Sequence, residues 1–302
     1  MVSIITVNYN QADYTCALLD SIRRQDYRDV EVFVVDNASR DNPAARIAAQ
    51  YPEVHFLRSE KNLGFAGGNN LALSQAHGDY LLFINNDAEL PSGCLASLLR
   101  FLEQHPQVGI VSPLICYYRQ AGQPQQPAAD LIQYAGMPQV HPCTGRSQML
   151  GNGESDQGQY AQPAPTGYAH GAAMLIRREV LEQVGPMEEA FFLYYEEVDW
   201  SERIRQAGWE VWIEPRAKVY HKESASMQDA GSLKTYYLSR NRVWFMRRHY
   251  GGWRLAVFYA FLLLVTVPKH AISYLLKGQR ENLAAFLDGV WWNFKAPSTG
   301  RV

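Results

Sequence analysis

The sequence lacks the patterns that would assign its chemistry at once. No segment has the spacing of a Walker A loop or of a G-x-G-x-x-G fingerprint, which counts against P-loop nucleotidases and dinucleotide-dependent dehydrogenases. The four cysteines stand far apart and no pair has metal-ligand spacing, so free thiols in a reducing cytosol are expected. The sequence also contains no internal repeat.

A secretion signal and a long apolar run are absent too. Residues Met1–Val7 lack a basic region and a cleavage site, and they are typical of a core strand, so the protein is expected to stay in the cytosol. Leu255–Val267 is apolar and carries no charge, but its 13 residues fall short of the roughly 20 that a spanning helix needs.

The 302 residues, of which 47% are hydrophobic, suffice for one large α/β domain with a tail or for two modest domains. The net charge of −2 hides an asymmetry. From Gly231 onward, 11 Lys and Arg face two acidic residues, a charge of +9, while residues 1–230 carry −11. A basic end on an acidic body indicates an anionic partner for that end, either nucleic acid or anionic lipid.

Apolar runs alternate with helical patterns in the first third of the chain. This order predicts a mostly parallel sheet with helices on both faces, whose ligands bind at the carboxyl ends of the strands. The predicted strands are Val2–Val7, Val30–Val35, Val54–Leu57 and Tyr80–Ile84, and the predicted helices are Asn42–Gln50 and Asn69–His77. The polar residues that close these strands are site candidates as a group: Asn8, Asp36, Asn85 and Asp87.

The chain then changes character twice. Residues 117–165 are rich in Gln, Pro and Gly and predict an irregular insertion with short hairpins. Regular structure is expected to return with strands at Gly171–Ile176, Val211–Ile213 and Val219–Tyr220 and helices at Glu179–Val184 and Glu197–Gln206.

The tail combines aromatic, basic and apolar segments. Tyr236–Tyr250 is aromatic and basic, and two apolar stretches, Leu255–Val267 and Ala271–Leu276, follow on either side of Pro268. We expect helices that lie in the interface of an anionic membrane. A buried core helix with a solvated basic face is the alternative, and nucleic-acid binding fits the apolar block less well.

Three groups of residues could carry chemistry. Asp87, with Asn85 and the later His221, could bind a divalent metal, although an Asx turn and a structural histidine are the alternatives. Glu196, Glu197 and Asp199 crowd together, so one of them could have a raised pKa and act as a base. The alternative is a helix N-terminus, where acidic residues are favoured. The segment Lys61–Asn70, with three glycines and three asparagines, could cradle a ligand or form a tight loop.

Together these segments resemble the family 2 inverting glycosyltransferases of the GT-A fold, rhamnosyltransferase-like members above all. The resemblance covers nearly the whole chain and rests on five matches in order: Ile4–Asn10, Val34–Ser39, Asn62–Asn70, Asn85–Asp87 and Glu196–Trp200.

The resemblance implies roles for individual residues. Those implied to bind the nucleotide sugar are Thr6, Asn8, Tyr9, Asp36, Asn37, Asn62, Gly64, Asn70, Asn85 and Asn86. Asp87, His221 and, more weakly, Asn85 would hold Mn²⁺ or Mg²⁺, with Asn85 standing where the family's D-x-D motif has its first Asp. The base stays open between Glu197 and Asp199, because Glu196-Glu197 replaces the usual Glu-Asp. Residues on the acceptor side would be His170, Gly171 and Trp200.

The resemblance also implies a function. An inverting transferase would move a sugar, best L-rhamnose from dTDP-rhamnose, to a hydroxyl of a lipid-linked cell-surface glycan. Residues 1–230 would form the catalytic domain, with a nucleotide-sugar half (1–115) and an acceptor half (116–230). Residues 231–302 would hold it at the inner face of the cytoplasmic membrane, and a homodimer through this tail stays open. A nucleotidyltransferase and a catalytically silent nucleotide-sugar-binding scaffold are the alternatives.

Overall fold

A computed structural model describes residues 1–118, 130–222 and 231–295. Within these residues the centre of the molecule is a ten-stranded sheet in the order β3-β2-β1-β4-β9-β6-β10-β5, with β7 paired to β6 and β8 paired to β10. The strands are β1 (Val2–Asn8), β2 (Val30–Asn37), β3 (His55–Ser59), β4 (Tyr80–Ile84), β5 (Ala88–Glu89), β6 (Val108–Tyr117), β7 (Ile132–Tyr134), β8 (Ala164–Pro165), β9 (Ala173–Arg177) and β10 (Glu210–His221).

The first half of the sheet is parallel, as the sequence predicts. Strand β1 pairs in parallel with β2 and β4, and Asn8 lies opposite Asp36 in that register. The direction reverses at β9, which is antiparallel to both β4 and β6, and β10 again runs parallel to β6. The carboxyl ends of β1, β2, β4 and β10 therefore carry four of the candidate residues.

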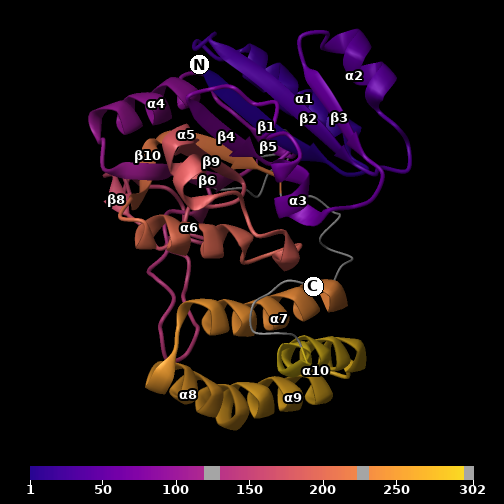
Figure 1. Cartoon of the computed structure of the whole chain (residues 1–302), viewed down its shortest axis with the longest axis vertical. Helices are drawn as coiled ribbons and strands as arrows, with labels where there is room; N and C mark the ends of the chain where they lie inside the picture. The colour runs from indigo at the N-terminus through magenta and orange to yellow at the C-terminus, as the bar shows by residue number, and fades with distance from the viewer. Residues whose placement is uncertain (119–129, 223–230, 296–302) are drawn as a thin grey trace.

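Helices cover both faces of the sheet (Figure 1). Along β1 the side chains alternate: Ile4 packs in the core cluster shared with α1 (Ala12–Arg23), α2 (Ala44–Gln50) and α4 (Cys94–Gln104). Ile5 packs on the other face with α3 (Gly64–Asn70), α5 (Arg178–Val184) and α6 (Glu196–Gln206). The period-two pattern of a doubly covered sheet explains why these strands are almost wholly apolar.

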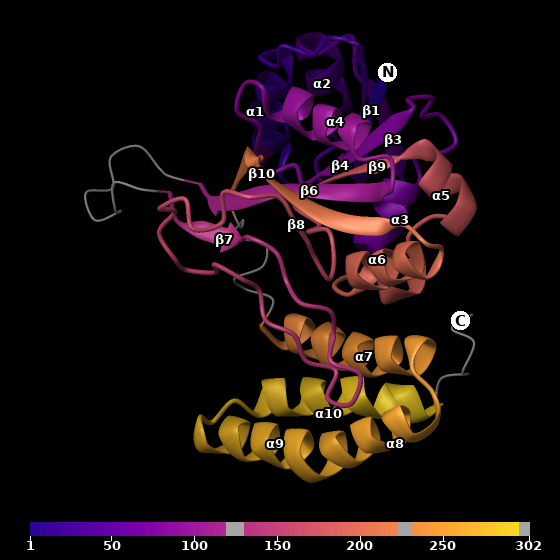
Figure 2. The same cartoon turned by 90° about the vertical axis from the view of Figure 1, so that its left-hand side faces the viewer.

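The C-terminal helices form a separate layer beside this domain. They are α7 (Gly231–His249), α8 (Gly252–Phe261), the π-helical turn η3 (Leu262–Thr266), α9 (Val267–Leu276) and α10 (Arg280–Lys295). Helix α7 lies nearest the sheet domain, and a strand-like excursion of the insertion reaches down to the layer (Figure 2). There the Tyr250 hydroxyl donates to the Val140 carbonyl at 3.1 Å, and the Arg146 guanidinium lies 4.7 Å from the centre of the Phe261 ring.

Three of the predicted elements are wrong in position or extent. The helix predicted at Asn69–His77 forms earlier, at α3, because its glycines allow close packing on β1: a Cβ at Gly68 would lie 2.9 Å from a methyl group of Val7. The two short strands predicted at Val211–Ile213 and Val219–Tyr220 are one strand, β10, with a register shift between Glu214 and Lys218.

The tail helix is longer than the sequence suggests. Pro268 does not interrupt it, and Gly252–Leu276 runs as 25 residues that are long and apolar enough to cross a membrane by length and composition. The proline stands at the second position of α9, directly after the π-helical turn, where the hydrogen-bond register changes and its missing N–H is tolerated.

Candidate active site

Asn85, Asp87 and His221 come together at the carboxyl edge of the sheet. Strand β4 ends just before Asn85, and the pairing of β5 with β10 sets Ala88 opposite His221. The His221 Nε2 lies 3.1 Å from the Asp87 Oδ1 and 3.2 Å from the Asn85 Nδ2, and both Asp87 and His221 are buried. Three residues separated by up to 136 positions in the chain thus share one cluster.

The donor atoms of this cluster fit a divalent cation. The His221 Nδ1 lies 2.8 Å from the Gln133 Oε1, an acceptor, which assigns the proton to Nδ1 and leaves the Nε2 lone pair directed at the carboxylate. Carboxylate, amide and imidazole are suitable Mn²⁺ or Mg²⁺ ligands, and an outer hydrogen bond such as that to Gln133 orients a metal-binding histidine. Within the part of the chain that the structure describes, no group of three or more His, Cys, Asp and Glu side chains gathers, so substrate oxygens would complete the coordination.

Glu196 and Glu197 begin α6 in an apolar environment. The Oε2 atom of each is buried with no hydrogen-bond partner in the structure, although Glu197 as a whole is partly exposed. Burial raises the pKa of Glu197 to about 7, and burial together with the neighbouring charge of Glu197 raises the pKa of Glu196 well above its usual value. A carboxyl group that titrates near neutrality is suited to accept a proton.

Asp199 has a different environment. It is completely buried and its carboxylate accepts from His249 Nε2 at 2.7 Å, Arg248 Nε at 3.0 Å and Arg203 Nε at 3.0 Å. Burial alone would raise the pKa of Asp199, but the His249 hydrogen bond and the two guanidinium charges outweigh it, so the pKa is lowered. Asp199 therefore joins α6 to α7, and both of its carboxylate oxygens are engaged by these partners.

The strand ends of β1 and β2 form a hydrogen-bonded edge. The Asn8 Nδ2 donates to the Asp36 Oδ1 at 2.8 Å, and the buried Asp36 carboxylate lies 3.3 Å from the guanidinium of Arg58. The hydroxyl of Thr6 is buried and has no hydrogen-bond partner among the described residues, while Tyr9 is 43% exposed beyond the strand. Arg58 escaped sequence reasoning, although its place near the end of β3 follows the same strand-end rule.

The asparagines of the glycine-rich segment support its backbone. The Asn37 Nδ2 donates to the Asn62 Oδ1 and to the Gly64 carbonyl, both at 3.0 Å, while Asn70 donates to the Met187 carbonyl at 2.8 Å. Gly64 has φ of +72°, and a Cβ there would lie 2.1 Å from the Phe192 carbonyl oxygen. Only glycine fits this turn.

The residues expected on the acceptor side lie in different surroundings. Gly171 lies beside Glu197, whose Oε1 would be 4.0 Å from a Cβ on the glycine, and the Ala172 carbonyl accepts from the Asn85 N–H at 3.0 Å. Burial, with a smaller contribution from the neighbouring His221, lowers the pKa of His170 to about 3, so this imidazole is neutral.

Two expected site residues make contacts within the core. Trp200 is wholly buried, donates to the Gly185 carbonyl at 2.9 Å and packs edge-on against Phe83, and its role on the acceptor side stays a prediction. Asn86 is buried and donates to the Thr15 hydroxyl at 3.1 Å, which ties the strand end to α1. Gln133, the partner of His221, was missed because it lies in the insertion, where no pattern is readable.

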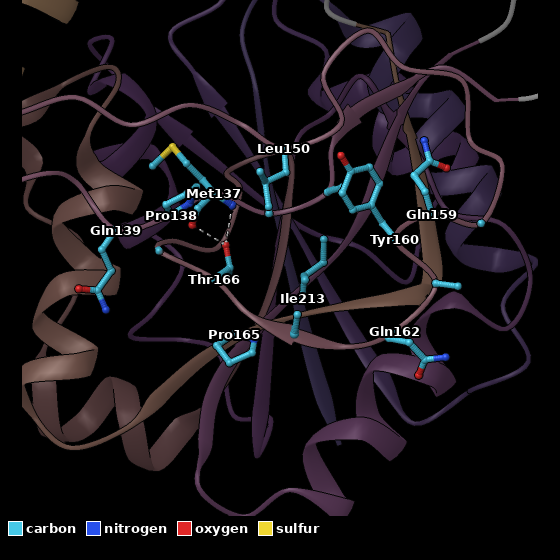
Figure 3. Close-up of a pocket in the computed structure, with 16 residues that line it drawn as sticks. Met137, Pro138, Gln139, Leu150, Gln159, Tyr160, Gln162, Pro165, Thr166 and Ile213 are labelled. Atoms are coloured by element: carbon cyan, nitrogen blue, oxygen red, sulfur yellow. Dashed lines mark hydrogen bonds between the residues drawn. The ribbon is translucent and has the colours of Figure 1, made fainter.

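A cavity of about 530 Å³ lies between the insertion and β10 (Figure 3). Its wall includes Met137, Leu150, Tyr160 and Thr166, and the Met137 N–H donates to the Thr166 hydroxyl at 2.9 Å. Its lining includes neither the Asp87–His221 cluster nor Glu197. The cavity therefore forms no part of the candidate chemistry.

Comparison with known proteins gives a consistent result. The sequence model described as "Glycosyl transferase family 2" matches residues 3–185. The chain is 25% identical over 295 residues to an N-acetylglucosaminyl-diphospho-decaprenol L-rhamnosyltransferase of Mycobacterium tuberculosis, covering 93% of this chain and 96% of the relative. It is 27% identical over 208 residues to the low-salt glycan biosynthesis hexosyltransferase Agl10 of Haloferax volcanii, covering 68% of this chain and 61% of the relative.

Solved structures share the fold. A mannosyltransferase of Pyrobaculum calidifontis, solved in complex with GDP-Man and Mn²⁺, superposes with a TM-score of 0.61 at 20% identity and covers 97% of this chain and 87% of its own. The S. aureus TarS fragment 1-349 with UDP-GlcNAc has a TM-score of 0.59 at 19% identity, covering 96% and 81%.

Proposed function

The chain belongs to glycosyl transferase family 2 and is a glycosyltransferase of the GT-A fold, and on that premise we propose that it is an inverting rhamnosyltransferase. The donor in this proposal is dTDP-rhamnose and the acceptor is a hydroxyl of a lipid-linked cell-surface glycan. The observation that carries the choice of sugar is the relative that covers 93% of the chain, whose name gives an L-rhamnosyl transfer to a diphospho-decaprenol carrier.

The proposed reaction is one displacement with Glu197 as the base. Glu197 accepts the proton of the acceptor hydroxyl, and that oxygen forms a bond to the anomeric carbon on the face opposite the nucleotide. The bond between that carbon and the diphosphate oxygen breaks, its electron pair leaves with the nucleoside diphosphate, and the anomeric centre is inverted. Among the carboxylates of α6, Glu197 is preferred because two guanidinium groups and an imidazole surround Asp199.

The other residues bind and orient the reactants. Asp87 and His221, with Asn85, are the proposed ligands of Mn²⁺ or Mg²⁺, which when bound would neutralise charge on the departing diphosphate. Thr6 and the Asn8–Asp36 pair are proposed to line the nucleoside site, where the unpartnered Thr6 hydroxyl offers a free hydrogen-bonding group.

Ligand binding tests the donor. We expect dTDP-rhamnose with Mn²⁺ to raise the melting temperature more than UDP-glucose, UDP-galactose or GDP-mannose, because a ligand at about 100 times its Kd stabilises the folded state by about 2.7 kcal/mol. Transfer to a lipid-linked acceptor is then measured with the selected donor. A selective response to another sugar nucleotide would replace rhamnose, and binding without transfer or hydrolysis would favour the scaffold alternative.

We further propose that the tail lies on the inner face of the cytoplasmic membrane and does not span it. Helices α8 to α10 expose many large apolar side chains. In the most apolar 18-residue stretch of Gly252–Leu276, only 17% is buried inside the protein. The most exposed are Trp253, Leu263, Leu264, Ile272, Leu275, Leu276 and Trp291. Several arginines of α7 turn inward to protein carbonyls and carboxylates, so the outward charge comes mainly from the later helices.

Vesicle binding tests this placement. Replacing Leu264 and Leu276 together by glutamate should abolish co-flotation with anionic vesicles, because these side chains are 77% and 83% exposed and contribute no core packing. The control is Leu71→Glu, an exposed leucine on the catalytic domain, which should float like the wild type. Equal flotation of the double variant, or wild-type protein that ignores vesicles at low salt, would contradict the proposal.

A further inference from the structure

The segment that leads into Glu196 and Glu197 has an unusual backbone. Phe192, Tyr194 and Tyr195 have φ of 64°, 67° and 75°, values in the left-handed region that bulky residues rarely adopt. Each such residue costs on the order of 1–3 kcal/mol and persists only where the surroundings hold it. Something must therefore hold the segment 191–195 in place at the start of α6.

One side chain of the tail contacts three carbonyls of this segment. Asn241, on α7, is completely buried, and its Nδ2 donates to the carbonyls of Phe191 at 3.0 Å, Leu193 at 2.8 Å and Tyr194 at 2.7 Å. Three acceptors share the two hydrogens of one amide. The contact spans most of the strained segment and ends two residues before Glu196.

The neighbouring residue fixes the orientation of that amide. The Arg240 Nε donates to the Asn241 Oδ1 at 2.7 Å, which directs the Nδ2 toward the loop. A second guanidinium nitrogen of Arg240 donates to the carbonyls of Phe191, at 2.8 Å, and Ala190. On α10, the Asn293 Nδ2 donates to the Arg240 main-chain carbonyl at 2.9 Å, a contact that involves neither the guanidinium nor the Asn241 amide.

The opposite side of the segment is also attached. The Phe65 N–H donates to the Phe192 carbonyl at 2.8 Å, beside the turn at Gly64 that no other residue could adopt. The loop is thus held between the glycine-rich segment and α7. Without the contacts from α7, the segment would still be attached to the glycine-rich segment at Phe192, but the residues that follow Phe192 and lead to Glu196 could change conformation.

We propose that Asn241 is a positioning residue for the reaction: it holds segment 191–195 in its strained conformation and thereby sets where the Glu197 carboxylate stands. This inference rests on the proposed role of Glu197. In this proposal α7 contributes to the geometry of the active site, so the tail has a second role in addition to membrane binding.

The test compares two identical substitutions at buried asparagines. Asn241→Asp keeps the size of the side chain but replaces the donor with oxygen, opposite three carbonyls. Asn293→Asp, at a buried asparagine of α10 that donates to the Arg240 and Gly289 carbonyls, is the control for loosened tail packing. Arg240→Lys, which keeps the charge but removes the bond to the Asn241 Oδ1, is a milder second variant if Asn241→Asp fails to fold.

Two readouts separate positioning from folding. In full-length protein, amide hydrogen exchange of residues 190–197 should rise at least about tenfold in Asn241→Asp and in Arg240→Lys but not in Asn293→Asp. Steady-state kcat should fall by roughly 100-fold in Asn241→Asp, the cost of a small misplacement of a catalytic group, while the Kd of dTDP with Mn²⁺ changes less than about twofold.

Three outcomes would overturn the inference: unchanged exchange in both loop variants, an equal loss of kcat in Asn293→Asp, or a dTDP affinity that falls in parallel with kcat. Hydrogen exchange needs no turnover. A wild-type protein without transferase activity would therefore remove the proposed function and still leave the attachment of the loop measurable.

Discussion

Replacing Glu197 by glutamine is expected to lower kcat by roughly 10²–10⁴-fold, the contribution typical of a positioned general base. Glutamine has the same shape but cannot accept the proton of the acceptor hydroxyl. The affinity for the sugar nucleotide should stay within about twofold, because the residues proposed to bind the nucleotide lie on other elements. Transfer assays and calorimetry on the same preparation measure both quantities.

In the wild type, kcat is expected to increase with pH around neutrality. Burial raises the pKa of Glu197 to about 7, so the carboxylate needed as base forms only as pH rises through that value, and kcat should fall below it. Burial raises the pKa of the neighbouring Tyr134, Tyr168 and Tyr195 above the usual tyrosine value, so these phenols stay neutral in this range. Burial and the charge of Glu197 also raise the pKa of Glu196. In Glu197→Gln the residual activity should lose this acidic limb.

Stability should change in the opposite direction to activity. The pKa of the Glu197 carboxyl is about 4.5 in the unfolded chain and about 7 in the folded protein. Its protonated form therefore stabilises the folded protein fully at pH values below about 4.5, and this stabilisation is lost as the pH rises through about 7. Glu197→Gln should therefore have a larger free energy of unfolding than the wild type at pH 8, by up to about 3 kcal/mol at 1.36 kcal/mol per pKa unit. Denaturant unfolding of both proteins at pH 5 and pH 8 measures this difference.

A matched control lies on the same helix. Glu202 pairs with Arg205 near the protein surface, so Glu202→Gln should keep kcat and gain no stability. If Glu197→Gln retained wild-type turnover, or if Glu202→Gln lost as much, Glu197 would not be the base.

The contrast between Glu197 and Asp199 shows what the sequence could not resolve. Two acidic residues two positions apart on one helix look equivalent in a sequence, yet a helical turn directs them to different environments. The partners that distinguish them, Arg248 and His249, lie about fifty residues away on α7. Only tertiary packing reveals that Asp199 is held by these partners while Glu197 is not.

Other parts were predictable because their signals are local. Strand ends alone suffice to put Asn8, Asp36 and Asp87 at one edge of the sheet, since parallel strands share their carboxyl ends. The same rule could not predict Gln133, which contacts His221 from an insertion without periodicity. It could not predict Asn241 either, because the partners of Asn241 are backbone carbonyls, which carry no sequence signature. The burial of Trp200 was not predictable for a related reason: motif position does not say whether a side chain faces the core.

Replacing Asp87 by alanine should abolish the dependence of donor binding on Mn²⁺. Asp87 supplies the carboxylate oxygen of a cluster whose other members, the imidazole of His221 and the amide of Asn85, are proposed as neutral ligands of the metal. Without the carboxylate, a metal would meet no anion from the protein, and the metal-dependent gain in donor affinity should fall by at least about 100-fold, more than the 10–100-fold typical of losing an outer-shell partner.

Calorimetry with dTDP-rhamnose, with and without Mn²⁺, separates this effect from general damage. Wild type and Asp87→Ala should bind the donor equally without metal, and only the wild type should gain affinity when metal is added. Gln133→Leu should give an intermediate loss, because the imidazole remains but its orientation is no longer fixed. Asp156→Ala is the matched control, since this aspartate pairs with Lys218 on β10 at 2.6 Å, outside the cluster. A metal-dependent gain that survives in Asp87→Ala would move the metal site away from the carboxyl end of β4.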